Sequence, residues 1–273
     1  MILVTGATGG VGRYLVDELL DASQKVRALT RDPAIARLPS GIEVARTGDL
    51  PMDGIDSVFL NPVLFWGSDP EGFLARAKEH GVRRIVLLSS SATLGGETGN
   101  PIGAHHLKLE RQIEASGLEW TFIRPGAFAS NSLQWADQIR TEGVVRGPYG
   151  EAHTAPIHEG DIAAVAARAL VTDDHVGTKP VLSGPESLTT AEQARILGEA
   201  IGRPVRFEEL TPEAAREAMT SGYATEEIAD ALLRMFADLV GRPAEISPEV
   251  ERITGRPGRT FAQWASEHAA DFQ

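Results

Sequence analysis

Three glycines lie at regular spacing near the start of the chain, in the stretch "TGATGGVG": Gly6, Gly9 and Gly12. An apolar run, "ILV", precedes them and is typical of a buried strand, and an amphipathic stretch, "GVGRYLVDELLDA", follows and is typical of a helix. A glycine-rich turn in this setting lets backbone N–H groups approach a pyrophosphate, which the positive end of the helix stabilises. The pattern therefore predicts a dinucleotide site in which Thr8 and Gly10 leave room for the phosphates. The alternative is a glycine-rich turn that binds no ligand.

The elements that must position this turn alternate between strands and helices. Strands are expected over 2–6, 25–31, 41–50, 55–62, 83–91 and 119–126, and helices over 10–22, 70–81 and 103–116. The run "RRIVLLSSS" is almost wholly apolar, as expected of a central parallel strand that is covered on both faces. This alternation predicts an α/β fold with a Rossmann-like, doubly wound parallel sheet.

The pattern becomes rich in helices after the sixth strand. Helices are expected over 158–172 and 189–202, strands over 180–185 and 203–210, and a mostly helical tail over 211–273. We therefore expect residues 1–150 to form the Rossmann part. Residues 151–273 are expected to form a smaller C-terminal part that completes the sheet edge and the substrate cleft within one structural unit.

The choice between NAD and NADP is usually made at the end of the second strand. An acidic residue there binds the ribose 2′-hydroxyl of NAD, whereas an arginine holds the 2′-phosphate of NADP. The sequence reads "LTRDP", which places Arg31 and Asp32 side by side. Arg31 comes first and offers a bidentate fork, while Asp32 before Pro33 is suited to starting a turn. NADP(H) is therefore favoured, and NAD(H) is the alternative. The alternative for Arg31 is a surface arginine that contacts only solvent.

Polar residues also follow the other expected strands, at the edge of the sheet where ligands of such folds bind. The third strand is followed by Asp49 and Leu50, which suit contact with the adenine ring, and the fourth by Asn61 and Pro62, which suit a cofactor ribose. The fifth strand ends in serines 89 to 91, which belong to the same edge.

The composition narrows the class of partner. The chain of 273 residues carries a net charge of −12 and has no cysteine. Disulfides and thiol nucleophiles are therefore excluded, and no basic footprint for nucleic acid is present. No secretory leader and no apolar stretch of membrane-spanning length is visible, so we expect a cytoplasmic protein, monomeric or homodimeric, without membrane or nucleic-acid partners.

Several stretches together resemble the NmrA-like group of atypical short-chain dehydrogenases/reductases. The similarity runs through "VTGATGGVGRYLVDELL", "VRALTRDP", "VLLSSS", "SGLEWTFIRPGAF", "HEGDIAAVAARAL" and "LSGPESLTTAEQARILGEAIGRPVRF". The group contains triphenylmethane reductase and quinone oxidoreductase relatives as well as NAD(P)-sensing regulators. The resemblance implies that the cofactor phosphates touch Gly6, Thr8, Gly9, Gly10, Val11 and Gly12. It also implies that Arg31 holds the 2′-phosphate and that Pro125, Ala127 and Phe128 border the nicotinamide.

Many enzymes of this kind carry a Tyr-x-x-x-Lys pair on the helix expected over 103–116. None of the three tyrosines here begins that motif. The resemblance places Ile102 where the tyrosine would be and His106 where the lysine would be, followed by Glu110 in a His-x-x-x-Glu variant. Ser90 and His106 are the candidate catalytic proton donors near the nicotinamide. For His106 we favour a hydrogen bond to the cofactor ribose without proton transfer, and we expect its neighbour His105 to be exposed to solvent.

Two other groups of polar residues give weaker indications of a functional site. His153 and His158 lack the His-Glu-x-x-His spacing, so no metal site is expected. Glu159 and Asp161 open an alanine-rich helix and are interpreted as acids that complement its dipole.

The aromatic side chains of Phe65, Trp66 and Trp135 follow expected strands. They either line an aromatic pocket or pack as satellite core. The sequence thus predicts an NAD(P)H-dependent reductase of a quinone, ketone or polycyclic aromatic small molecule. A non-catalytic NAD(P)-binding sensor is the alternative.

Overall fold

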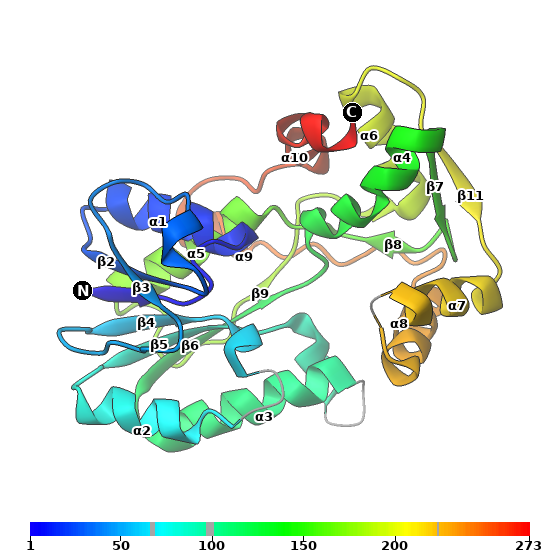
Figure 1. Cartoon of the computed structure of the whole chain (residues 1–273). Coiled ribbons are helices and arrows are strands. Elements are labelled where there is room, and N and C mark those ends of the chain that lie inside the picture. The colour runs from blue at the N-terminus through cyan, green and yellow to red at the C-terminus, as the bar shows by residue number, and fades with distance from the viewer. Residues whose placement is uncertain (66–68, 97–100, 223) are drawn as a thin grey trace.

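A parallel sheet of seven strands forms the centre of the computed structural model, which describes residues 1–65, 69–96, 101–222 and 224–273. Its strand order is β3-β2-β1-β4-β5-β6-β9 (Figure 1). The strands are β1 (Ile2–Val4), β2 (Val26–Thr30), β3 (Glu43–Arg46), β4 (Ser57–Leu60), β5 (Arg84–Leu88), β6 (Glu119–Pro125) and β9 (Val181–Leu182). Every pairing in this sheet is parallel, which confirms the predicted Rossmann-like fold.

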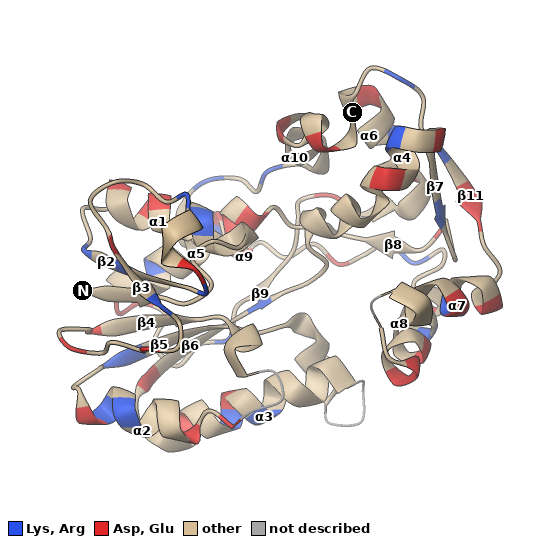
Figure 2. Ribbon diagram, viewed as in Figure 1, with Lys and Arg blue, Asp and Glu red and all other residues tan. Residues whose placement is uncertain are grey.

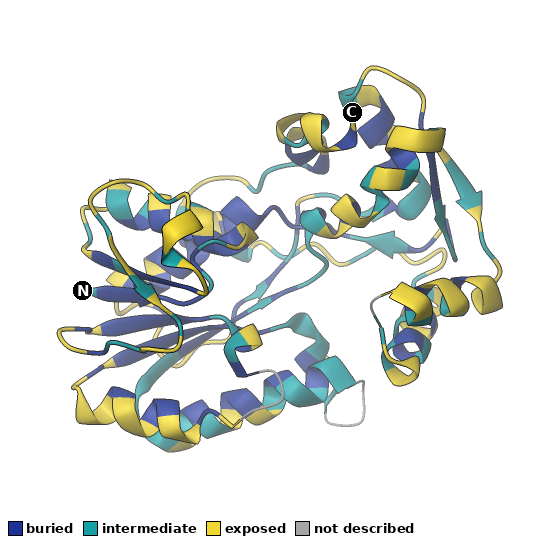
Figure 3. Ribbon diagram, viewed as in Figure 1, coloured by how far each residue is buried: buried dark blue, intermediate teal, exposed yellow. Residues whose placement is uncertain are grey.

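Helices cover both faces of the sheet. On one face lie α1 (Gly10–Asp21), α5 (Glu159–Val171) and α9 (Glu249–Thr254), and on the other lie α2 (Glu71–Glu79) and α3 (Pro101–Ser116) (Figure 1). Alternate residues of the central strands enter two separate cores, since successive side chains point to opposite faces. Ile2 and Val4 pack beneath α1 and α5, whereas Leu3 packs beneath α2 and α3. Figure 3 shows these strands as almost entirely buried.

Two helices are followed by glycines with left-handed backbone geometry. Gly81 follows α2 with φ +78° and Gly117 follows α3 with φ +77°. A residue with a Cβ rarely adopts this left-handed conformation, so glycine ends both helices.

The remaining helices and strands form a second group outside the large sheet, in which α10 packs on α6 around the buried Trp264. They are α4 (Ala136–Glu142), β7 (Val144–Gly147), β8 (His153–Thr154), β10 (Leu188–Thr189), α6 (Thr190–Ala200), β11 (Arg206–Glu209), α7 (Pro212–Gly222), α8 (Glu226–Asp238) and α10 (Phe261–Glu267). The pairs β8–β10 and β7–β11 form two small sheets. The element β9 and the helix α5 come after residue 150 in the chain and complete the layers of the large sheet.

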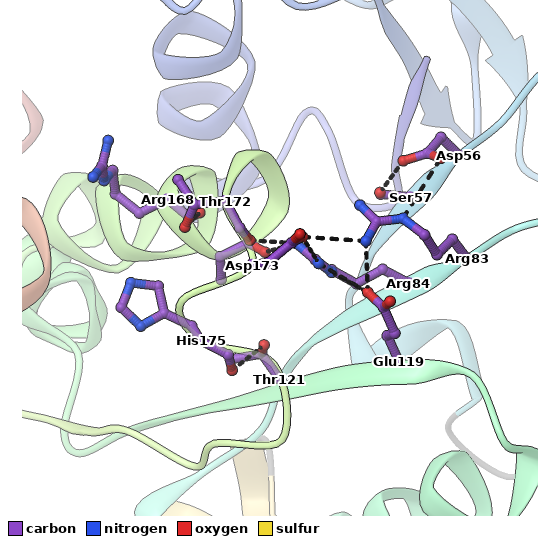
Figure 4. A network of polar contacts seen from close by, with 11 residues as sticks. Asp56, Ser57, Arg83, Arg84, Glu119, Thr121, Arg168, Thr172, Asp173 and His175 are labelled. Atoms are coloured by element: carbon purple, nitrogen blue, oxygen red, sulfur yellow. Dashed lines mark hydrogen bonds and ion pairs between the residues drawn. The ribbon is translucent and has the colours of Figure 1, made fainter.

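The amino-terminal edge of β5 and β6 is held by a fully buried arginine (Figure 4). Arg84 donates to the carbonyl oxygens of Ala169 (3.0 Å) and Thr172 at the end of α5, and to the carboxylate of Glu119 (2.8 Å). The carboxylate of Asp173 completes the contact. A cation at the carboxyl end of a helix satisfies carbonyls that the helix leaves open, so this network fixes α5 to the sheet at the edge opposite the carboxyl ends of the strands.

None of the helices in the described part of the chain has both the length and the apolar character needed to span a bilayer.

Candidate cofactor and substrate site

The glycine-rich turn has the shape that a pyrophosphate requires. Gly6 has φ +66°, and a Cβ there would lie 2.8 Å from Nδ2 of Asn61. A Cβ on Gly12 would lie 2.1 Å from the carbonyl oxygen of Gly6, so α1 packs against the turn only with glycine at this position. Gly9 and Gly10 are exposed, and no side chain caps the amino end of α1. The open N–H groups of the first helical turn therefore fit a phosphate anion.

A residue that the sequence analysis did not select, Arg13, spans this turn. Its Nε donates to the carbonyl oxygen of Thr8 (2.9 Å) and its Nη1 to that of Arg37 (2.9 Å). The guanidinium thereby joins the glycine-rich turn to the segment that follows β2. Val11, one of the predicted contact residues, has its side chain buried in the core under α1, which leaves its backbone as the part that faces the turn.

At the end of β2, Asp32 and Arg31, the two candidates for contact with the ribose 2′ position, have different surroundings. Asp32 accepts a hydrogen bond from the backbone N–H of Ala34 (3.1 Å) and caps a short 3-10 helix, so its carboxylate serves the turn. Arg31 is exposed at the strand end. At the end of β3, Asp49 is exposed, whereas Leu50 packs on the core beneath α2 and α3 with φ +39°.

Asn61 is held against the glycine turn by the end of β1. Its backbone N–H donates to Oγ1 of Thr5 (2.7 Å), and its side-chain Oδ1 accepts from the backbone N–H of Val63 (3.1 Å). The side chain therefore lies over Gly6, at the switch point between β1 and β4 where the strand order reverses. Pro62 is buried at the start of the following 3-10 helix.

Ser89 and Glu110 meet in a buried polar cluster behind the strand ends. The hydroxyl of Ser89 donates to Oε1 of Glu110 (2.5 Å). Arg124 donates to both oxygens of the same carboxylate (3.0 and 2.5 Å), and Lys179 lies 3.9 Å away. Two cations therefore compensate a carboxylate that is 1% exposed, and Glu110 acts as an anchor between α3 and β6.

His106 lies one turn before Glu110 on α3 and is 8% exposed. Its Nδ1 is buried and has no hydrogen-bond partner among the described residues. Burial, with a smaller contribution from the neighbouring His105, lowers the pKa of His106 to about 4, against a weaker opposing effect of Glu110. The imidazole is therefore neutral near pH 7, with an unsatisfied ring nitrogen. His105 is half-buried, and burial lowers its pKa too, so the expectation that it is exposed was wrong.

Ser90 is half-buried and caps a 3-10 helix, Ser91–Gly95, by accepting from the backbone N–H of Ala92 (3.2 Å). Ile102, which takes the place of the family tyrosine, is half-buried on α3. Of the three tyrosines, Tyr14 donates to Glu267 at 3.3 Å on α10, and Tyr149 packs beside α7 and α8. Tyr223 lies outside the described residues.

A cavity of about 750 Å³ opens beside the end of β6. It is bounded by residues 127–138, by β7 and by the helices α7 and α8. Its lining residues are Ala127, Phe128, Ser130, Asn131, Ser132, Gln134, Trp135, Gln138, Val145, Arg146, Gly147, Pro148, Thr154, Pro156, Thr190, Gln193, Leu210, Ala215, Ala218, Met219, Leu232 and Phe236. Its volume lies in the range of small-molecule sites. The cavity therefore places an aromatic and apolar lining next to the residues expected to border the nicotinamide.

Two of the three aromatic residues weighed for such a lining can be placed. Trp135 lines the cavity, whereas Phe65 is buried in the core and packs on Phe73. Trp66 lies outside the described residues. Phe236, contributed by α8 more than a hundred residues later in the chain, was not anticipated because no local sequence pattern indicates which distant helix covers a site.

Glu159 and Asp161 have more specific roles than complementing a helix dipole. Glu159 is 2% exposed and accepts from the backbone N–H of Ser130 (2.8 Å) and from Nε1 of Trp264 (3.0 Å). A Cβ on Gly10 would lie 3.3 Å from its Cγ. Glu159 therefore joins the cavity wall to α10 and lies close to Gly10 at the start of α1.

Asp161 accepts from the backbone N–H of Arg259 (2.7 Å) and pairs with its guanidinium, which fixes the segment before α10. His158 caps α5 by accepting from Gly160 N–H (2.9 Å), and the ring of His153 lies 3.2 Å from the hydroxyl of Ser187. Within the described ranges no group of three His, Asp or Glu side chains is arranged to hold a metal ion.

A family model described as NAD(P)H-binding matches residues 6–173. The chain belongs to this family. A (4-alkanoyl-5-oxo-2,5-dihydrofuran-3-yl)methyl phosphate reductase of Streptomyces griseus is 40% identical over 100% of this chain and 99% of its own. An NAD(P)H azoreductase of Xenophilus azovorans is 36% identical over 100% and 99% of the two chains. The NADPH complex of an Escherichia coli quinone oxidoreductase is 26% identical, with a TM-score of 0.79 over 98% of this chain and 99% of that one.

These similarities agree with the geometry of the turn and the strand ends. The chain is an NmrA-like atypical reductase and an NAD(P)H-dependent oxidoreductase of the quinone and azo reductase type. The resemblance in the sequence and the expected class of cofactor are thereby confirmed.

Proposed function

We propose that this protein is an NADPH-dependent reductase of quinones, conjugated ketones or related aromatic acceptors. The observation that carries the proposal is the cavity of about 750 Å³ whose lining begins at Ala127 and Phe128, directly after β6. Phe128, Trp135 and Phe236 give it aromatic surface, and Met219 adds a polarisable side chain. A planar ring system held there lies next to the strand ends of the cofactor site.

The cofactor half of the proposal rests on the phosphate turn and Arg31. When bound, the cofactor supplies the hydride. Gly6, Gly9 and Gly12 shape the turn, and Arg31 is the side chain available for a 2′-phosphate because Asp32 is occupied by its own turn. This arrangement supports a preference for NADPH over NADH.

The proposed reaction does not need a tyrosine as proton donor. A quinone that accepts a hydride becomes a stable oxyanion and takes its proton from water. His106 is neutral at pH 7, because burial lowers its pKa to about 4, so it does not serve as a cationic acid. We assign the imidazole of His106 a hydrogen bond to the nicotinamide ribose, and we assign Ser90 the position nearest the acceptor oxygen.

The relatives support the class of acceptor. One is named an NAD(P)H azoreductase and another a quinone oxidoreductase, and both names describe transfer of electrons to conjugated acceptors. A conjugated acceptor of this kind delocalises the charge that a hydride brings, which removes the need for a dedicated acid.

The experiment compares wild type with Ser90→Ala, His106→Gln and Phe128→Ala in the reduction of 1,4-naphthoquinone by NADPH. We expect His106→Gln to raise the KM for NADPH with a smaller effect on kcat. Phe128→Ala is expected to raise the KM for the quinone. Full turnover by both Ser90→Ala and His106→Gln would remove these two side chains from the mechanism. Tight NADPH binding without consumption of it by the wild type would favour a non-catalytic sensor.

A further inference from the structure

One ionisable side chain, Arg146, lies among the described residues that line the cavity. The residues outside the described ranges contain no lysine and no arginine. Among the described lining residues, the charge that can select a substrate therefore comes from Arg146 and from the groups that pair with it.

Two carboxylates occupy the guanidinium of Arg146. Its Nη1 and Nη2 donate to the two oxygens of Glu142 (3.0 and 2.6 Å), and its Nε donates to Oε2 of Glu208 (2.9 Å). Glu142 is the last residue of α4, four residues before Arg146, and Glu208 pairs directly with Arg146 across β7 and β11. Figure 2 shows the basic segment of β7 beside the acidic one of β11. The hydrogen bond from Arg146 holds the pKa of the Glu142 carboxyl below its usual range, so that carboxylate is ionised near neutral pH.

The two ion pairs of Arg146 leave few N–H donors for an anionic substrate. Three of the five N–H donors of a guanidinium are used, including both nitrogens of the fork that binds a phosphate or sulfonate. The cluster of one cation and two carboxylates carries a net negative charge. An anion in the cavity would meet this charge without a free cation to offset its lost hydration.

A neutral polar group remains for the substrate at the same wall. Gln138 lines the cavity, and its Oε1 accepts from the backbone N–H of Arg146 (2.8 Å). This bond orients the amide so that its Nε2 is the group left to donate, and no described residue accepts from it. A carbonyl oxygen of an uncharged acceptor matches that donor.

We propose that the cavity selects uncharged carbonyl acceptors and rejects anionic ones, and that the Glu142–Arg146–Glu208 cluster sets this selectivity. The proposal rests on the proposed function and narrows its substrate class. It also separates this chain from the Streptomyces relative, whose name describes a phosphate ester, since a phosphate calls for guanidinium or ammonium donors that are not already paired.

The test measures binding separately from turnover, so that each failure can be recognised. The probes are 1,4-naphthoquinone and its 2-sulfonate, which differ by one sulfonate group and its negative charge; the charge variants below separate the effect of charge from that of size. Binding of each, in the presence of NADP⁺ to prevent reduction, is followed by quenching of tryptophan fluorescence, to which Trp135 in the cavity wall contributes. The wild type is expected to bind the uncharged quinone at least tenfold more tightly.

The variants change the charge of the cluster in opposite directions. Glu208→Gln and Glu142→Gln free donors of Arg146, so each is expected to reduce the preference for the uncharged quinone by about fivefold, and the double variant by more. Arg146→Met leaves the two carboxylates unpaired and is expected to increase the preference. Glu213→Gln, which removes an exposed carboxylate of α7 without a contact to Arg146, serves as the matched control with an unchanged ratio.

Equal binding of the two quinones by the wild type would overturn the proposal, as would unchanged ratios in the Glu142 and Glu208 variants. Binding of the uncharged quinone without any reduction by NADPH would contradict the proposed function while leaving the inferred selectivity in place.

Discussion

Protonation of His106 offers a test in which the size of the effect can be worked out from the structure. Burial lowers the pKa of this imidazole from 6.5 to about 4, so the unfolded chain binds a proton at a higher pH than the folded one. The free energy of unfolding therefore contains a contribution that is complete above pH 6.5 and is lost as the pH falls from 6.5 towards 4. A pKa shift of this size lowers the free energy of unfolding by roughly 3 kcal/mol once the pH is below 4. By pH 5, about 2 kcal/mol of it is already lost relative to pH 7.5.

The assay is urea unfolding of wild type and His106→Gln between pH 7.5 and pH 5. Other titrating groups are common to both proteins, so they cancel in the difference between the two curves. The wild type is expected to lose about 2 kcal/mol more than the variant over this interval. Removal of the neighbouring repulsion in His105→Gln is expected to raise the pKa of His106 and shrink the difference. Parallel curves for wild type and His106→Gln would refute the reasoning, and so would an imidazole NMR signal from His106 that titrates near 6.5.

Three further expectations address the glycine-rich turn, the buried Arg84 and the preference for NADPH over NADH. Gly12→Ala should abolish NADPH binding in a titration, because its Cβ would lie 2.1 Å from the carbonyl oxygen of Gly6, whereas Gly72→Ala on α2, with no atom within 4 Å, should bind normally. Arg84→Met should lower the free energy of unfolding in urea by about 3 kcal/mol, since it leaves buried acceptors unpaired. Arg83→Met, at the exposed neighbouring position, should lower the free energy of unfolding by less than about 1 kcal/mol. Arg31→Ala should weaken binding of NADPH by tenfold or more and leave binding of NADH nearly unchanged, and equal losses for the two would contradict the role of Arg31.

The sequence was informative wherever structure depends on neighbouring residues. Strand and helix patterns predicted the sheet. The helices expected over 70–81 and 103–116 end close to those bounds, next to Gly81 and Gly117, because the requirement for positive φ is local. The position of Asp32 before a proline indicated its turn role, which the bond to Ala34 shows.

Contacts between distant segments were not predictable in the same way. Glu159 was interpreted from its own helix, while its partners Ser130 and Trp264 come from other parts of the chain. His105 was expected to be exposed because helical periodicity does not show which segments cover that face. The neutralised Arg146 depends on Glu208, which the pairing of β7 with β11 brings beside it.

The central claim is that this protein passes a hydride from NADPH to an uncharged conjugated carbonyl acceptor. Its most direct test is the loss of the nicotinamide absorbance band when purified protein is mixed with NADPH and 1,4-naphthoquinone, with the quinol measured in parallel. The account predicts protein-dependent oxidation with one quinol formed for each NADPH consumed. Absence of oxidation across a set of uncharged quinones, by protein that demonstrably binds NADPH, would contradict it.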